Sequence, residues 1–78
     1  MIKLKVYEAS WCGPCQRSHQ LLSKLNNIQI EYIDIDTCGR KGITNLPTVE
    51  IIRDNALYNI IVGELTEDDI IDIQKLND

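Results

Sequence analysis

Hydrophobic and polar residues alternate along residues 2–7, which predicts a β-strand because successive side chains of a strand point to opposite faces. Residues 28–35, with the sequence IQIEYIDI, are rich in β-branched side chains and predict a second strand. Between them a helix is expected to begin at Pro14 and to continue to about Leu25. The residues spaced to share its buried face are Ser18, Leu21, Leu22 and Leu25. Two strands joined through a helix are expected to be parallel.

The second half of the chain predicts a β-hairpin. Pro47 precedes a third strand at residues 48–52, and proline is tolerated at the start of a strand but not in its middle. Residues 53–55 form a turn, and residues 57–62 return as a fourth strand that ends at Gly63. The two strands of a hairpin are antiparallel, so the complete sheet is expected to be mixed.

A last helix is predicted by capping chemistry. Thr66 caps its start, Asp69 reaches back three residues later, and acidic residues face the positive end of the helix. Residues 38–44 are short and polar and are interpreted as a loop with one or two helical turns. The predicted order β-α-β-(α)-β-β-α indicates an α/β fold with a four-stranded mixed sheet flanked by helices. We expect one domain spanning residues 1–78.

Composition and charge exclude several classes of function. The net charge of −4 and the isoelectric point of about 4.8 argue against nucleic-acid binding, which needs clustered Lys and Arg. Arg40 and Lys41 are the only adjacent basic pair. No apolar run approaches the ~20 residues of a membrane span, and the first residues do not resemble a signal peptide. With three cysteines, too few for a disulfide scaffold, we expect a cytoplasmic protein without membrane contact.

The chemistry of the chain is concentrated in the segment from Trp11 to Cys15. A Cys-x-x-Cys sequence between a strand and a helix puts the sulfur of Cys12 at the helix N-terminus, where free N–H groups stabilise a thiolate. Only the thiolate attacks a disulfide, and Cys15, one turn further, is close enough to resolve the resulting mixed disulfide. The pattern predicts Cys12 as the nucleophile and Cys15 as the resolving residue, with Cys15 the more buried of the two.

Trp11-Cys12-Gly13-Pro14-Cys15 resembles the active-site motif of the thioredoxin family, and the resemblance covers almost the whole chain. Leu46-Pro47-Thr48 is similar to the cis-proline loop of that family, and residues 62–66 resemble its last strand and the start of its final helix. The resemblance implies a thioredoxin-like fold and a docking surface for Cys-containing segments of other proteins. That surface is a flat apolar patch made of Trp11, Gly13, Pro14, Leu46, Pro47, Val62 and Gly63.

The family resemblance further implies reduction of protein disulfides, since Gly-Pro between the cysteines is typical of the reducing branch. It implies disulfide-containing protein substrates, an upstream dithiol donor such as a thioredoxin reductase, and no cofactor or metal besides the redox-active disulfide. We also expect a monomer. Two features depart from the family pattern. Only eleven residues precede Cys12, and Val6 and Tyr32 stand where the family has a buried acid and a lysine. Glu8, Tyr32 or solvent are the candidates for deprotonating Cys15.

Three other interpretations stay open at this stage. Asn45-Leu46-Pro47 and Val62-Gly63-Glu64 match half of the glutathione-binding pattern of glutaredoxins, so a glutathione-coupled reductase is one alternative. A binding or scaffold subunit that needs no redox activity is another. A zinc site made of Cys12, Cys15, His19 and Cys38 is disfavoured by the motif around the cysteines. We interpret His19 as an exposed helix residue without an evident partner, and Cys38 as an incidental loop thiol.

Overall fold

The computed structural model describes residues 1–38 and 42–77 and contains one four-stranded sheet. The elements along the chain are β1 (Ile2–Glu8), α1 (Gly13–Leu22), β2 (Gln29–Asp34), α2 (Ile35–Cys38), β3 (Thr48–Arg53), β4 (Ala56–Val62) and α3 (Glu67–Asn77). β1 pairs in parallel with β2 and antiparallel with β3, and β4 pairs antiparallel with β3, giving the order β2-β1-β3-β4. The predicted α/β fold with a four-stranded mixed sheet is confirmed.

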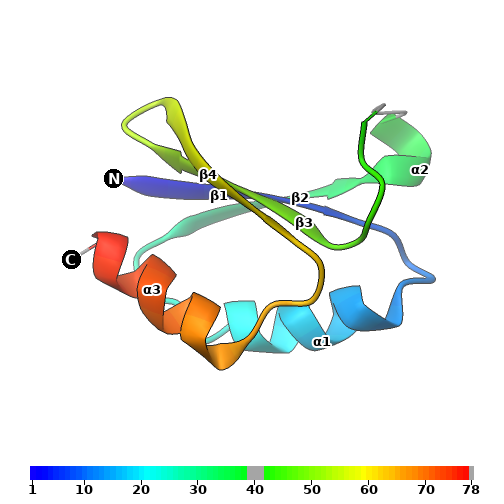
Figure 1. The fold of residues 1–78 in the computed structure, drawn as a ribbon, viewed down its shortest axis with the longest axis horizontal. Coiled ribbons are helices and arrows are strands. Elements are labelled where there is room, and N and C mark those ends of the chain that lie inside the picture. The colour runs from blue at the N-terminus through cyan, green and yellow to red at the C-terminus, as the bar shows by residue number, and fades with distance from the viewer. Residues whose placement is uncertain (39–41, 78) are drawn as a thin grey trace.

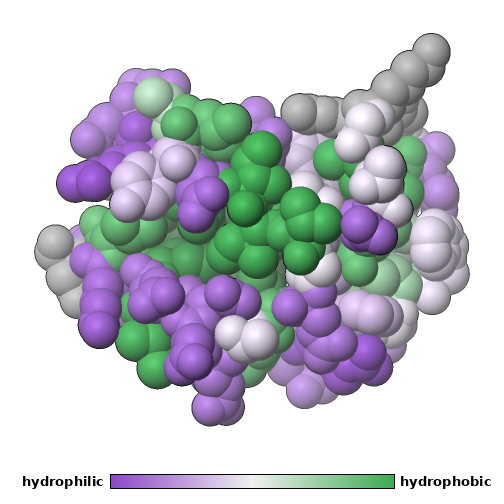
Figure 2. All heavy atoms as spheres, in the orientation of Figure 1, coloured by the Kyte–Doolittle hydropathy of each residue, from purple (hydrophilic) through white to green (hydrophobic). Residues whose placement is uncertain are grey.

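Helices α1 and α3 contact each other on one face of the sheet. Helix α2 lies beyond the end of β2, at the right of the view in Figure 1. The period-two pattern of β1 turns its apolar side chains toward these helices, where they form the core. The buried core residues are Ile2, Leu4, Val6, Leu22, Val49, Ile51, Leu65, Ile70 and Ile73. Figure 2 shows apolar residues across the middle of this view, over β4, and hydrophilic residues along its lower edge. Among the described residues, no helix is long and apolar enough to cross a bilayer.

Helix α1 ends at Leu22, three residues before the predicted end at Leu25. The amides of Lys24 and Leu25 donate to the carbonyls three residues earlier, at 3.0 and 3.1 Å, so the last turn is tightened. Asn27 then takes a positive φ of 60°, which agrees with the predicted turn at the two asparagines. Leu25 still packs against the core from this turn, so the apolar spacing is confirmed although the helix is shorter.

Two turns position the remaining elements. Ile35, predicted as the end of the second strand, instead begins α2, because the Asp34 carboxylate accepts the amide of Asp36 at 2.9 Å and starts a helical turn. The turn predicted at residues 53–55 is confirmed at Asp54 and Asn55, which have φ values of 52° and 69°, whereas Arg53 belongs to β3 and β4 begins one residue earlier than predicted, at Ala56. Asp54 and Asn55 both tolerate the left-handed region that a two-residue hairpin loop requires.

The start of α3 has the predicted cap. The amide of Thr66 donates to the Asp69 carboxylate at 2.9 Å, and the amide of Asp69 donates to the Thr66 hydroxyl at 3.2 Å. This reciprocal pair satisfies N–H groups that have no partner within the helix. The cap therefore fixes where α3 begins after the segment that follows β4.

Candidate active site

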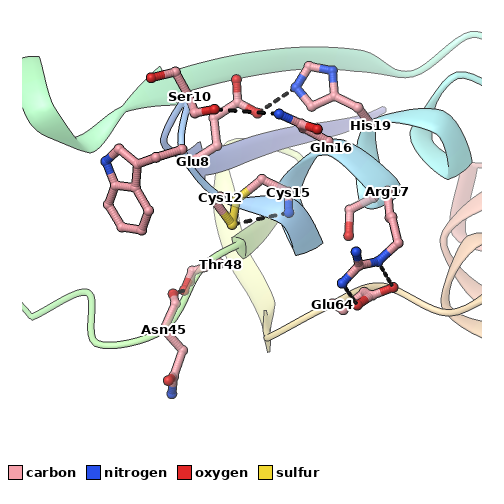
Figure 3. The surroundings of a disulfide bond; sticks show 12 residues. Glu8, Ser10, Cys12, Cys15, Gln16, Arg17, His19, Asn45, Thr48 and Glu64 are labelled. Atoms are coloured by element: carbon pink, nitrogen blue, oxygen red, sulfur yellow. Dashed lines mark hydrogen bonds and ion pairs between the residues drawn. A yellow bond between two sulfur atoms is a disulfide. The ribbon is translucent and has the colours of Figure 1, made fainter.

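The Cys12–Cys15 pair is a disulfide at the N-terminus of α1 (Figure 3). Cys12 is the N-cap residue, with extended backbone, and its Sγ accepts the backbone N–H of Cys15 at 3.1 Å. The two Cα atoms are 5.2 Å apart, within the usual range for a disulfide. A hydrogen bond to the charged form of a group favours that form, as does the positive end of a helix. The site therefore stabilises a thiolate on Cys12, as the position of the motif predicts.

Both cysteines are buried, at 5 % exposure for Cys12 and 3 % for Cys15. Together with Ala9 they form a small apolar cluster, against which Ile35 and Leu46 pack. The difference in burial between the two sulfur residues is thus small. The two cysteines differ instead in the surface hollow that each one lines.

Cys12 opens to a hollow of about 530 Å³, which we call the front hollow. It is lined by Trp11, Cys12, Gly13, Pro14, Ile35, Ile43, Thr44, Asn45 and Leu46. Four of the predicted docking residues are therefore brought together around Cys12. Residues 43–45 also line this hollow, and they were not among the predicted docking residues. The one feature of the sequence that could have indicated them is that they directly precede Leu46-Pro47.

Trp11 stands at the rim of the front hollow with 67 % of its surface exposed. Its indole N–H donates to Oδ2 of Asp36, in α2, at 3.0 Å. This contact ties the side chain to α2, and it was not predicted because the two residues are 25 positions apart in the sequence.

The remaining predicted docking residues lie behind or beside this hollow. The Leu46–Pro47 bond is cis, as the family resemblance implies, and Pro47 itself is buried. The Pro47 carbonyl accepts the amide of Gly63 at 2.8 Å, which joins the segment after β4 to the proline loop. Val62 is 56 % exposed and lines a separate hollow with Ile60. The structure thus places Val62 and Gly63 outside the front hollow.

An ion pair flanks the disulfide on the α1 side. The Arg17 guanidinium donates two hydrogen bonds of 3.0 Å each to the carboxylate of Glu64. The hydrogen bond from Arg17 lowers the pKa of Glu64 below its usual range, and the carboxylate in turn raises the pKa of Arg17. Both side chains are exposed, so the pair is screened by solvent and salt.

His19 has partners, contrary to the prediction of an unpartnered helix residue. Its Nε2 contacts Oε2 of Glu8, on β1, and its ring stacks on Tyr32, on β2, with centroids 4.0 Å apart. Burial, and then the charge of Glu8, raise the pKa of Tyr32, so the phenol is neutral near pH 7. Val6, which replaces the acid of the family, is fully buried and pairs with Tyr32 across the strands.

No group of three or more His, Cys, Asp or Glu side chains that would hold a metal ion is present among the described residues. The side chain of Cys38 is outside the described part of the chain, so its predicted role as an incidental thiol stays a prediction, as does its place in the zinc interpretation.

A disulfide at the start of a helix, with a cis-proline loop packed against it, defines a protein of the thiol–disulfide oxidoreductase class. A family model for thioredoxin matches residues 3–75, and the chain belongs to the thioredoxin family. The chain is 30 % identical to a thioredoxin of Bacillus subtilis, over 80 % of this chain and 68 % of that protein.

Two further comparisons agree. A thioredoxin of Listeria monocytogenes is 30 % identical over 70 % of this chain and 62 % of its own length. The chain thus spans about two thirds of the length of these curated relatives. A solved mutant thioredoxin of Halobacterium salinarum superposes with a TM-score of 0.78 at 26 % identity, covering 96 % of this chain and 73 % of the other.

Proposed function

We propose that this protein reduces disulfide bonds of protein substrates by dithiol exchange, with Cys12 as the nucleophile and Cys15 as the resolving residue. The single observation that carries the proposal is the position of Cys12. Its Sγ caps α1 and accepts an N–H at 3.1 Å, and Cys12 is among the residues that line the front hollow. A stabilised thiolate that opens to a hollow beside exposed apolar groups is suited to attack on a docked disulfide.

The reaction balances as two exchanges. The Cys12 thiolate attacks one sulfur of the substrate disulfide, a Cys12–substrate bond forms, and the other substrate sulfur leaves as a thiolate that takes a proton. Cys15 then loses its proton and attacks the Cys12 sulfur, so the Cys12–Cys15 bond forms and the second substrate sulfur leaves. The substrate gains two electrons and two protons, and the cysteine pair is oxidised.

The substrate segment is proposed to lie across the front hollow. Trp11, Gly13, Pro14 and Leu46 offer contact surface there, and the Leu46 backbone offers hydrogen bonds. Pro47 acts by fixing that backbone. Val62, at the end of β4, and Gly63 extend the proposed docking surface. The amide of Gly63 donates to the Pro47 carbonyl at 2.8 Å, so these two residues adjoin the proline loop.

The oxidised pair must be reduced again before the next cycle. We propose an upstream dithiol donor, such as a thioredoxin reductase, since family membership supports a dithiol partner. In this proposal the protein acts as a monomer in the cytoplasm. It uses the Cys12–Cys15 disulfide itself and no separate cofactor or metal.

Two cysteine variants test the mechanism in a Cys38→Ser background, which leaves only the pair reactive. With insulin as the substrate, Cys12→Ser is expected to abolish reduction, and Cys15→Ser is expected to trap a mixed disulfide through Cys12. Ser23→Ala, which removes a hydroxyl at the exposed far end of α1, should retain activity. Full reductase activity of Cys12→Ser would overturn the assignment.

The reduction potential separates the proposed role from the alternatives. Trp11 is the only tryptophan and adjoins Cys12, so its fluorescence in dithiothreitol redox buffers reports on the pair. A potential more negative than about −260 mV, the lower end of extracted cytosolic glutathione values, is expected for a protein-disulfide reductant. A value well above about −220 mV would indicate glutathione coupling instead. Full biological function of a Cys12→Ser, Cys15→Ser variant would indicate a scaffold subunit.

A further inference from the structure

The buried resolving cysteine needs a proton acceptor. Cys15 is 3 % exposed and lies among Ala9, Ile35 and Leu46, and apolar burial of this kind disfavours a thiolate. The family position for a buried acid holds Val6, which cannot accept a proton. Tyr32, the strand partner of Val6, is a neutral phenol near pH 7 and is not a base there. The second exchange therefore requires a group elsewhere around Cys15.

A second hollow leads from Cys15 to such a group. This rear hollow, of about 260 Å³, is lined by Glu8, Ala9, Ser10, Cys15, Gln16 and His19, and it shares no residue with the front hollow. A water molecule takes about 30 Å³ in the liquid, so the rear hollow has room for several. Figure 3 shows Glu8, His19 and Gln16 together on one side of the disulfide, with Arg17 and Glu64 on another.

The geometry points to Glu8 and His19 as a proton-accepting pair for the Cys15 thiol, acting through water in the rear hollow. This inference rests on the proposed function. Glu8 ends β1, and His19 follows Cys15 by one helical turn, so both are fixed to elements that also hold the disulfide. The contact of His19 Nε2 with Glu8 Oε2 and the stacking of the ring on Tyr32 hold the imidazole at the hollow.

The charges around the pair suit this task. The contact between His19 Nε2 and Glu8 Oε2 puts an imidazole nitrogen and a carboxylate oxygen side by side at the rear hollow, and both are groups that can accept a proton. From β2, Tyr32 contributes a neutral phenol, and Asp34, the register partner of Glu8, contributes a carboxylate that already accepts the Asp36 amide. From α1, Arg17 is engaged by Glu64, and Gln16 is uncharged. The groups that face the pair are thus neutral or negative, apart from Arg17, whose charge is engaged by Glu64.

In the second exchange the Cys15 thiol gives its proton to the pair, and its sulfur attacks the Cys12 sulfur of the mixed disulfide. The Cys12–Cys15 bond forms while the Cys12–substrate bond breaks, and the electron pair leaves on the substrate sulfur. The pair then returns its proton to the departing thiolate or to solvent. Because the rear hollow is separate from the front hollow, this proton transfer does not compete with the docked substrate for space.

The test separates the two exchanges in the full chain carrying Cys38→Ser. Reduced protein is mixed rapidly with excess oxidised insulin, quenched with acid, and the mixed disulfide is quantified by mass spectrometry. Glu8→Gln and His19→Gln are expected to form the mixed disulfide within twofold of the parent rate. They are expected to resolve it about tenfold more slowly at pH 7, a modest loss for general-base catalysis because water has access. Their resolution rate should rise about tenfold per pH unit as hydroxide replaces the pair.

Chemical rescue distinguishes proton transfer from a merely structural role. His19→Ala opens space at the rear hollow, and added imidazole is expected to restore resolution in proportion to its concentration. Arg17→Gln, which removes a charge on α1 away from that hollow, should leave resolution unchanged and insensitive to imidazole. Equal resolution rates in the parent, Glu8→Gln and His19→Gln, or slow resolution without rescue, would overturn the inference. Failure of the proposed function itself has another signature, since no mixed disulfide would form even in the parent.

Discussion

Arg17 and Glu64 are 47 residues apart in the sequence, yet two hydrogen bonds of 3.0 Å join their side chains beside the disulfide. The pair connects the first turns of α1 to the segment between β4 and α3. It therefore links the helix that carries both cysteines to the strand end that adjoins the proline loop.

The stabilising effect of this ion pair is expected to depend on pH. The pKa of Glu64 is lowered in the folded state, so the pair contributes stability above the unfolded pKa of about 4.3, and that contribution is lost as the pH falls through the lowered folded value. The difference in Tm between the parent and Glu64→Gln should therefore be small and positive at pH 7 and vanish in strong acid. A double-mutant cycle with Arg17→Gln, and its loss in 1 M salt, are the controls. A Tm difference independent of pH would contradict the assignment.

Ser18 is expected to be a stabilising buried polar residue. It is fully buried on α1, and its hydroxyl accepts the amide of Leu65 at 3.0 Å. Ser18→Ala leaves that amide without its partner, which costs about 1–3 kcal/mol of unfolding free energy. Urea denaturation measures the loss. Ser23→Ala, at the exposed end of the same helix, should cost well under 1 kcal/mol, and equal losses would contradict the special role of Ser18.

Two isoleucines of α3 offer a matched test of the core. Ile73 is 1 % exposed and lies in the core, whereas Ile71 is 51 % exposed. Ile73→Ala is expected to cost about 2–5 kcal/mol, and Ile71→Ala less than about 0.5 kcal/mol. A chain of this size has only about 4–12 kcal/mol in total, so the first variant approaches unfolding. Comparable denaturation midpoints for the two variants would show that α3 packs through another face.

The hydrogen bond between Trp11 and Asp36 is expected to affect substrate binding rather than chemistry. Asp36→Ala frees the indole at the rim of the front hollow, and a lost hydrogen bond of about 0.5–1.5 kcal/mol corresponds to a two- to tenfold rise in KM for a protein substrate. The value of kcat should stay within twofold. Asp36→Asn keeps an acceptor oxygen and serves as the control. A fall in kcat with unchanged KM would assign Asp36 a different role.

Local chemistry made most of the fold predictable. The strand at the N-terminus follows from its alternation, α3 from its capping residues, and the hairpin from Asp54 and Asn55, because each signal lies within a few residues. The end of α1 and the start of α2 were misjudged, since side-chain caps at Asp34 and tightened hydrogen bonds after Leu22 override the apolar pattern. Such small differences in local hydrogen bonding leave no trace in the spacing of apolar residues.

The residues of the candidate site likewise fall into those that could be predicted from the sequence and those that could not. Cys12, Cys15 and the Leu46-Pro47 pair could be named from their motifs. The partners of His19 could not, because Glu8, His19 and Tyr32 lie on three different elements and meet only when β1, α1 and β2 assemble. The contribution of residues 43–45 to the front hollow was missed for the same reason, since they meet Trp11 and Cys12 only in the folded chain.

The strand order has a consequence for how the site withstands local unfolding. Cys12 follows β1 and Leu46-Pro47 precedes β3, and these are the two inner strands of the sheet, each hydrogen-bonded on both sides. Edge elements exchange their amide hydrogens through low-energy opening, whereas inner strands open only near global unfolding. Fraying of β2 or β4 thus leaves the cysteine pair and the proline loop in register with each other. The redox centre is attached to the part of the molecule that should be the last to open.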